Sequence, residues 1–266
     1  MNEKMNSIMV FDFETTGLPK RAWTDYTLTS THDKRSGRMI PASVESDYPY
    51  AVQLSYILYN IEKKTARIVD DIIRLPEDVI ITPESESIHH ISLEKTQGKT
   101  RKVMNRETGI YYFQKNLTIE QVLHKFMKDF RKADVVVSHN IQFDRNMLLV
   151  EMDRIRTNPK KKVFDEYIQE IYTSNKMFCT AKNGANICKL KAVNRIGQVY
   201  YRMPKLIILY TTLFQEDTLN EDKLHNALYD VILCLRSFCK MRFNLDIYGI
   251  NKQITTLIDD VTDKNK

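Results

Sequence analysis

Short apolar runs bounded by turn signals predict strands in several parts of the chain. The run at 7–13 (SIMVFDF) contains β-forming residues and is followed by a Gly-Leu-Pro turn signal. It is therefore predicted to be a buried strand that carries polar groups at its C-terminal end. A polar turn at 61–64 joins two further candidate strands into a hairpin. The other predicted strands are 51–60, 65–74, 133–137 and 177–180.

Apolar residues at helical spacing predict helices between and after these strands. Residues 118–131 repeat apolar side chains at intervals of three and four, and Thr118 precedes them as a candidate N-cap. A short helix is expected near Ser92, and 101–115 is expected to be a small hairpin. Longer helices are predicted at 141–155, 204–214 and 222–243. This order of elements indicates an α/β domain built on a mixed sheet.

The chain of 266 residues shows no internal repeat and no sharp change of composition, so one domain is predicted. That domain would span 1–250, with insertions at about 20–49, 98–115 and 157–203. Residues 251–266 are polar and are predicted to be a tail that frays. The insertion at 20–49 is polar and contains several basic residues and Trp23, and it is too long for a simple connection, so it is either a functional loop at the mouth of a site or a disordered segment.

The composition, 42% hydrophobic and 28% charged, is that of an ordinary soluble globular protein. No stretch approaches the roughly 20 apolar residues that a bilayer crossing requires. The short apolar run at the N-terminus contains acids and does not resemble a signal peptide. We therefore expect a soluble intracellular protein, cytoplasmic or nuclear, without a membrane partner. The four cysteines form no CxxC pair, which argues against a structural zinc.

The distribution of charge is more informative than the net charge of +6. From Ile171 to Gln215 there is no Asp or Glu. The basic residues in this span are Lys176, Lys182, Lys189, Lys191, Arg195, Arg202 and Lys205. A solvated face would explain any one of these residues. The whole acid-free span predicts a surface kept positive for phosphates.

Asp12 and Glu14 are the first candidates for chemistry. In a strand, positions i and i+2 point to the same face, so both carboxylates would project side by side at the strand's end. Two adjacent carboxylates repel and raise each other's pKa unless a cation neutralises them. Hard oxygen ligands of this kind suit Mg²⁺ or Mn²⁺. Two acids on an ordinary exposed edge are the alternative.

Three further residues could join the same site. Asp144 falls in the first turn of a predicted helix, where the helix dipole favours an aspartate in any protein. The short strand before that helix would deliver Asp144 to the sheet edge that carries Asp12. His225 and Asp230 are five residues apart, which is about 140° out of register on a helix. His225 is therefore expected on the approach to the helix, with Asp230 inside it.

Together these residues form three ordered motifs, FDFETTGL at 11–18, HNIQFD at 139–144 and HNALYD at 225–230. They match the forms DxETTGL, HNxxFD and HxAxxD. The sequence thereby resembles the DEDDh, or DnaQ-like, family of 3′–5′ exonucleases over about residues 8–243. The resemblance implies an RNase H-like α/β fold, with a mixed β-sheet flanked by α-helices and interrupted by loop insertions.

The resemblance also implies a reaction and its residues. Asp12, Glu14, Asp144 and Asp230 would hold two Mg²⁺ or Mn²⁺ ions about the scissile phosphate, and His225 would be the general base. The substrate would be single-stranded DNA or RNA with a free 3′ end. Two alternatives stay open. One is a nucleic-acid-binding module of the same fold without turnover, and the other is a proofreading subunit that works with a polymerase or another replication or repair partner.

The family pattern also suggests substrate contacts, at Thr15, Thr16, Gly17, Leu18, His90, Asn140 and Phe143. The threonines would meet the terminal 3′ hydroxyl, and Leu18 would wedge beside the terminal base. Asn140 would approach a phosphate, while Phe143 would stack on the base or belong to the core. His90 corresponds loosely, because Ile91 replaces the family's glycine, and His89 is an alternative candidate.

Overall fold

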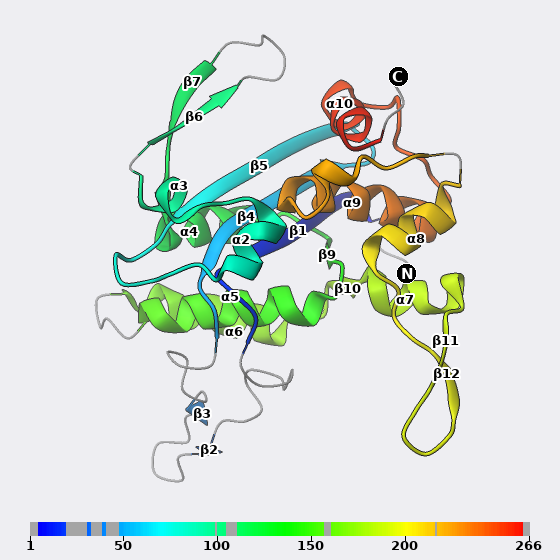
Figure 1. Cartoon of the computed structure of the whole chain (residues 1–266), viewed down its shortest axis with the longest axis horizontal. Helices are drawn as coiled ribbons and strands as arrows, with labels where there is room; N and C mark the ends of the chain where they lie inside the picture. Colours follow the sequence, from blue (N-terminus) through cyan, green and yellow to red (C-terminus); the bar gives the residue numbers. More distant parts are fainter. Residues whose placement is uncertain are drawn as a thin grey trace.

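A six-stranded mixed sheet forms the centre of the computed structural model (Figure 1). The structure describes residues 5–19, 31–32, 39–40, 48–98, 100–104, 111–156, 161–215 and 217–262. In sheet order, the strands are β10 (Met177–Cys179), β9 (Val135–Ser138), β1 (Ser7–Thr15), β4 (Ala51–Asn60), β5 (Thr65–Arg74) and β8 (Leu117–Thr118). β1 pairs antiparallel with β4 and parallel with β9, while β4 pairs antiparallel with β5.

Three smaller pairs of strands lie outside this sheet. They are β2 (Thr31–His32) with β3 (Met39–Ile40), β6 (Thr100–Met104) with β7 (Tyr111–Lys115), and β11 (Lys191–Val193) with β12 (Val199–Tyr201). The pairing of β6 with β7 agrees with the hairpin expected at 101–115. Most of the expected insertion at 20–49, including Trp23, lies outside the described residues.

Helices cover both faces of the sheet (Figure 1). One layer contains α4 (Ile119–Phe130), α5 (Ile141–Arg156) and α6 (Val163–Thr173). The other contains α7 (Thr180–Cys188), α8 (Leu206–Leu213), α9 (Ala227–Phe243) and α10 (Lys252–Val261). Two short helices, α2 (Pro83–His89) and α3 (Leu93–Gln97), follow β5. Among the described residues, no helix has the length and apolar character needed to cross a membrane.

The alternation of β1 places its two sets of side chains in separate cores. Met9, Phe11 and Phe13 are buried in the core of the α4–α5–α6 layer, whereas Ile8 and Val10 are buried against α9. Asp12 and Glu14 continue the even-numbered row, so they lie on the α9 face where that row leaves the core. The strand thus anchors two layers and presents two acids at its end.

Several elements follow the sequence expectations closely. β4 and β5 occupy the ranges expected for the hairpin, because both are rich in β-branched and aromatic residues and a polar turn separates them. Thr118 caps α4 by accepting a hydrogen bond from the Gln121 N–H, and the Gln121 side chain accepts one from the Thr118 N–H. This capping box fixes the start of the helix.

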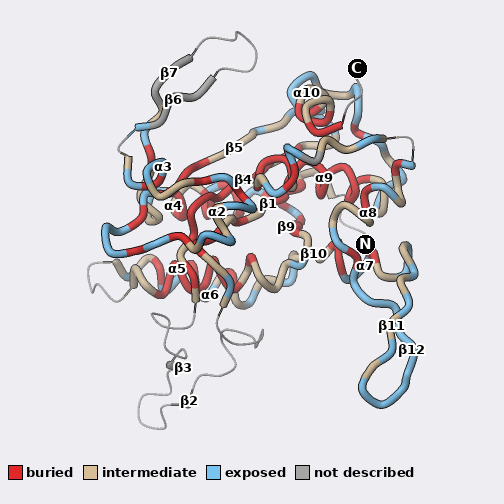
Figure 2. Tube along the Cα trace, in the orientation of Figure 1, coloured by how far each residue is buried: buried red, intermediate tan, exposed pale blue. Residues whose placement is uncertain are grey.

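The helix predicted at 222–243 begins later than expected. α9 starts at Ala227, with Asn226 as its N-cap, and a single 3₁₀ turn at Glu221–Lys223 precedes it. The Asn226 side chain accepts a hydrogen bond from the Leu228 N–H, which satisfies one of the free donors of the first turn. α9 then passes between the sheet and its neighbouring helices, so it is buried over most of its circumference (Figure 2).

Two other expectations differ from the structure. Residues 251–266 were expected to be a fraying polar tail, yet α10 buries Ile254, Leu257, Ile258 and Val261. Their spacing forms one apolar face on an otherwise polar segment. The span 157–203, expected as an insertion, contributes α6 to the main core and β10 to the sheet.

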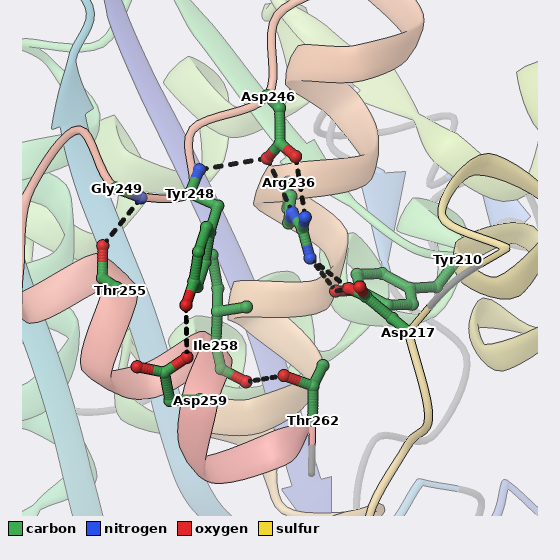
Figure 3. A network of polar contacts seen from close by, with 10 residues as sticks. All are labelled: Tyr210, Asp217, Arg236, Asp246, Tyr248, Gly249, Thr255, Ile258, Asp259 and Thr262. Atoms are coloured by element: carbon green, nitrogen blue, oxygen red, sulfur yellow. Dashed lines mark hydrogen bonds and ion pairs between the residues drawn. The ribbon is translucent and has the colours of Figure 1, made fainter. Parts of the chain in front are cut away.

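A buried arginine joins α9 to the segments around it (Figure 3). Arg236 is 2% exposed, and its guanidinium donates two hydrogen bonds of 2.7 Å to the Asp246 carboxylate. It also donates to Asp217 and to the Tyr210 hydroxyl, and it lies 4.0 Å from the ring centre of Phe214. One side chain therefore holds α8, α9 and both of the loops that carry these aspartates.

Replacing Arg236 by Ala should lower the free energy of unfolding by about 3–5 kcal/mol, because it leaves the buried Asp217 carboxylate without its cation. Denaturant unfolding followed by circular dichroism measures this change. The matched control is Arg242→Ala on the exposed side of the same helix, which should cost less than about 0.5 kcal/mol. Equal stability of the two variants would contradict a structural role for Arg236.

Candidate active site

Three carboxylates converge at the C-terminal end of β1. Oxygen atoms of Asp12, Glu14 and Asp230 all lie within 4.8 Å of one another. Asp12 and Glu14 come from the strand, opposite Ser55 and Gln53 of β4. Asp230 comes from the first turn of α9, which packs across β1 and β4. Each of the three carboxylates is partly buried, so the cluster opens toward solvent without being fully exposed.

The fourth predicted carboxylate, Asp144, approaches β1 along the edge that pairs with β9. The ladder between β1 and β9 ends at Val10, so the Phe13 N–H lies beyond its last pair. That N–H donates to Asp144 Oδ1 at 3.2 Å, and the Ser138 hydroxyl donates to Asp144 Oδ2. Asp144 is 1% exposed. Its carboxylate thus takes the place of a strand partner at the end of β1, and both oxygens are oriented by hydrogen bonds.

Burial raises the pKa of all four carboxyl groups, and repulsion from neighbouring carboxylates adds to the rise at Asp12, Glu14 and Asp144. Burial raises the pKa of Asp144 and that of Asp230 to about 7. The pKa of Asp12 is raised well above its ordinary value, first by burial and then by repulsion from the three other carboxylates. Burial, with repulsion from Asp230 and Asp144, does the same to the pKa of Glu14. These groups cannot all be ionised near neutral pH unless a cation balances their charge.

The donor set fits a hard divalent cation. Carboxylate oxygens are the ligands that Mg²⁺ and Mn²⁺ prefer, and the close approach of Asp12, Glu14 and Asp230 would satisfy such an ion. Asp144 adds a fourth carboxylate whose orientation is already fixed by Phe13 and Ser138. Among the described residues this is the one group of acidic, histidine or cysteine side chains with metal-ligand geometry.

His225 lies immediately before the helix that carries Asp230. It is exposed, and its backbone has φ of 60°, which is left-handed and uncommon for residues other than glycine. Asn226 then forms the N-cap, so His225 stands outside α9 while Asp230 stands inside it. This placement agrees with the expectation from their five-residue spacing. His90 and Asn140 also have positive φ, so three such residues occupy predicted site segments.

The residues after Glu14 form a tightly bonded turn. The Thr15 hydroxyl donates to the Gly17 carbonyl at 2.7 Å, and the Thr16 hydroxyl accepts from the Tyr50 N–H at 3.0 Å. Both threonines are buried, and their hydroxyls have partners inside the protein. Leu18 is 76% exposed, so this turn presents an apolar side chain to solvent next to the acidic cluster.

The two adjacent histidines at the end of α2 occupy different environments. His89 is buried, and its Nδ1 accepts a hydrogen bond from the Ile91 N–H at 3.0 Å. Its Nε2 therefore carries the proton and donates to the Thr15 carbonyl at 3.3 Å. Burial lowers the pKa of His89, which keeps the ring neutral. His90 is exposed instead, in a pocket that Asn226 and Tyr229 also line.

Asn140 lies in the turn just before α5, and Phe143 lies in the first turn of that helix, directly before Asp144. Asn140 is exposed, whereas Phe143 is half-buried and packs against the main core. A pocket beside Asn140 is lined by His139, Asn140, Gln142, Ala181, Met203, Pro204 and Lys205. The structure therefore places both residues close to Asp144 in the chain, one facing solvent and one partly in the core.

Sequence reasoning did not assign a role to Ser138 or His139. Ser138 ends a buried strand and bonds Asp144, and a polar residue at such a strand end was the available signal. His139 lies within hydrogen-bonding distance of the Thr180 hydroxyl and of the Pro204 carbonyl, at 3.0 Å each. Burial lowers the pKa of His139, so the ring acts as a neutral link between the turn before α5, α7 and the segment before α8.

No protein-family model matches the sequence, and no curated protein is significantly similar to it. Solved structures are similar, with TM-scores of 0.51 for cell-death related nuclease 4, 0.51 for exonuclease I from Methylocaldum szegediense and 0.52 for a zinc-bound complex of E. coli exonuclease I with single-stranded DNA. The sequence identities are 12%, 15% and 12%, and the matches cover 91%, 89% and 94% of this chain.

This chain covers 66%, 41% and 42% of the length of those three proteins, in the same order. At such low sequence identity, the likeness concerns the fold. It agrees with the mixed sheet and with its two helical layers. The chain therefore has the RNase H-like fold of the DEDDh-type 3′–5′ exonucleases that its motifs resemble.

Proposed function

We propose that this protein is a metal-dependent 3′–5′ exonuclease that removes nucleotides from the 3′ end of single-stranded DNA or RNA. The observation that carries the proposal is the convergence of carboxylates from three distant motifs. Asp12 and Glu14, Asp144, and Asp230 come from three motifs that are far apart in the sequence, yet their carboxylates meet at the end of one strand. A fold alone does not require this arrangement, which is costly without a cation.

The four carboxylates have the role of metal ligands in this proposal. Two bound Mg²⁺ or Mn²⁺ ions would supply a hydroxide near neutral pH and stabilise the leaving 3′ oxygen. Asp12, Glu14 and Asp230 offer oxygens that already lie within 4.8 Å of one another. Asp144 is held by the Phe13 N–H and the Ser138 hydroxyl, so it contributes a preset orientation to the ligand set.

His225 has the role of general base, accepting the proton of the attacking water. Imidazole suits this role because its ordinary pKa lies near the pH at which such enzymes work. His225 is exposed and precedes the helix, so its ring is open to solvent and is not part of the helical turn that holds Asp230. The left-handed backbone at this position is a local strain that fixes where the side chain leaves the chain.

The substrate is proposed to bind along the exposed residues around the cluster. Leu18 would pack beside the terminal base, Asn140 would meet a phosphate, and the partly exposed ring of Phe143 would wall the base pocket. The buried hydroxyls of Thr15 and Thr16 hold the turn, so their segment would meet the 3′ hydroxyl through its backbone and Gly17. His90 would line the neighbouring pocket.

The direct test uses oligonucleotides labelled at either end, incubated with Mn²⁺ or with EDTA. Release of labelled mononucleotide from the 3′ label in Mn²⁺ alone is the expected result. Binding without any release would favour the module that keeps the fold without turnover. Release that requires an added polymerase would favour the proofreading subunit. Parallel DNA and RNA substrates determine the preferred nucleic acid.

Asp12→Asn and Asp230→Asn should each reduce Mn²⁺-dependent nucleotide release by at least about 100-fold, since even the outer partners of metal ligands are worth 10- to 100-fold. Neither variant should be destabilised, because removing one charge from the cluster relieves repulsion. The matched control is Glu166→Gln, an exposed acid on α6 that should keep full activity. Near-normal activity in Asp12→Asn or Asp230→Asn would contradict the proposed site.

The stability of the metal-free protein should fall as pH rises. The carboxyl pKa values are near 4 in the unfolded chain but about 7 for Asp144 and Asp230 in the folded protein. The stability that these two protonated carboxyl groups contribute is therefore fully present below pH 4 and is lost as pH rises through 7. In EDTA, the Tm at pH 8 should be about 5 °C or more below that at pH 5. Mn²⁺ at pH 8 should restore it.

The matched comparison for this pH effect is Asp230→Asn, which should show a smaller fall in Tm between pH 5 and pH 8 and a smaller response to Mn²⁺. Differential scanning fluorimetry measures the Tm of both proteins in EDTA at pH 5, in EDTA at pH 8 and in Mn²⁺ at pH 8. A Tm in EDTA that is constant or rising over this range, together with no response to Mn²⁺, would be inconsistent with a cluster of repelling carboxylates.

His225→Asn should lower the single-turnover rate by about 10²- to 10⁴-fold and leave oligonucleotide affinity within about twofold, because a general base acts on the chemical step. Asparagine is the chosen replacement since it tolerates the left-handed backbone. His90→Asn, at the other exposed left-handed histidine, should instead change affinity more than rate. A His225→Asn enzyme with an unchanged rate would remove the general-base assignment.

A further inference from the structure

The hairpin of β11 and β12 projects from the body of the protein with little packing on either side (Figures 1 and 2). A two-stranded hairpin is marginally stable when neither face is covered. It nevertheless carries large apolar side chains in solvent, with Val199 65% and Tyr201 42% exposed. The turn at its tip adds Ile196, which is 77% exposed. Apolar side chains gathered on a projecting arm mark a binding surface.

The strand register separates the two faces of this arm. Lys191 pairs with Tyr201 and Val193 pairs with Val199, so these four side chains share one face. We call this set, with Met203 two residues further along, the arm face: Lys191, Val193, Val199, Tyr201 and Met203. The opposite face carries Tyr200, which pairs with Ala192, and Arg202, whose backbone N–H donates to the Leu190 carbonyl just beyond the ladder. Each face thus has one tyrosine and one basic residue close together.

The base of the arm is tied to the turn that leads to Asp144. The His139 ring nitrogens lie 3.0 Å from the Thr180 hydroxyl and 3.0 Å from the Pro204 carbonyl, at the start of α7 and just after β12. The pocket beside Asn140 is lined from the other side by Met203 and Lys205. Exposed residues therefore continue from the second motif, through this pocket, to the arm face.

The charge of the arm favours a polyanion. No Asp or Glu occurs between 171 and 215, and the arm lies wholly inside this span. Lys191 on the arm face, Arg195 at the tip, and Lys189 and Lys205 at the base of the arm are all exposed. An apolar surface made for an average protein partner would not need to exclude acids over 45 positions. Stacking faces beside basic groups are the combination that single-stranded nucleic acids bind.

We propose that the arm face binds the single strand a few nucleotides to the 5′ side of the 3′ end held at the carboxylates. This inference rests on the proposed exonuclease function for the position of the 3′ end. Tyr201 would stack on a base, Val199 and Val193 would pack against the next sugar or base, and Lys191 would contact a phosphate. At about 3.3 Å per residue, the arm reaches about 16 Å from Lys191 to its tip. A very short oligonucleotide would fill the site without reaching it.

The test compares two double variants that each remove one tyrosine and one positive charge. Lys191→Ala with Tyr201→Ala alters the arm face, and Tyr200→Ala with Arg202→Ala alters the opposite face. Binding is measured in EDTA by fluorescence anisotropy with oligothymidylate and oligouridylate of about 4 and about 20 nucleotides. Far-UV circular dichroism and Tm establish that each variant folds. Because EDTA prevents turnover, binding is measured independently of catalysis.

The arm-face variant should bind the long oligonucleotides at least about 5-fold more weakly, which is the lower bound for one lost stacking contact. The slope of log affinity against log salt should fall by about 0.7 for the lost phosphate contact. Its affinity for the short oligonucleotides, and the affinity of the opposite-face variant for both lengths, should stay within about twofold. The oligothymidylate and oligouridylate results separate DNA from RNA as the strand that the arm prefers.

Equal weakening by both variants would overturn the assignment of the arm face, because it would indicate a diffuse charge effect. No weakening by either variant would overturn the proposal altogether and leave the exposed apolar face as a protein-binding surface. Failure of the exonuclease proposal gives a different result: no metal-dependent release from the wild-type protein, whatever the arm variants do to binding.

Discussion

The repulsion among the carboxylates at the end of β1 is the constraint on which the site depends. Ile8, Val10, Asp12 and Glu14 point to the same face of β1. The packing of Ile8 and Val10 against α9 therefore also fixes the position of the two acids at the end of the strand. α9 then brings Asp230 within reach of both. Without a cation, this arrangement opposes folding above neutral pH. The arrangement persists because the apolar side chains on both faces of β1 are buried in the two cores.

The rest of the molecule holds the elements that bear these acids. The early end of the β1–β9 ladder leaves an N–H that only Asp144 satisfies, so sheet topology itself determines where that carboxylate stands. On the other side, Arg236 clamps the later turns of α9 to Asp217 and Asp246 (Figure 3). A rotation of α9 would break these bonds. The position of Asp230 is therefore secured by contacts far from the site.

Elements with a clear local signal could be predicted from the sequence, and those that depend on tertiary context could not. β4 and β5 are rich in β-branched and aromatic residues, α4 repeats apolar residues at helical spacing, and all three match their predicted ranges. α10 has an apolar face of only four residues within a polar segment, and its stability comes from burial against α9. The four acids were found from motifs. The hydrogen-bond partners of Asp144 could not be predicted in this way, because they depend on where the β1–β9 ladder ends.

The turn before α5 connects two properties that the sequence presents separately. Ser138 and Asp144 face the carboxylate cluster, while His139 between them faces α7 and the base of the β11–β12 arm. Burial lowers the pKa of His139, which favours the neutral ring in this connection. A strand bound along the arm would therefore be positioned by the same rigid turn that orients Asp144. Binding energy gained away from the scissile bond could in this way be used to align the 3′ end, which is the form of substrate positioning that raises the rate of the chemical step.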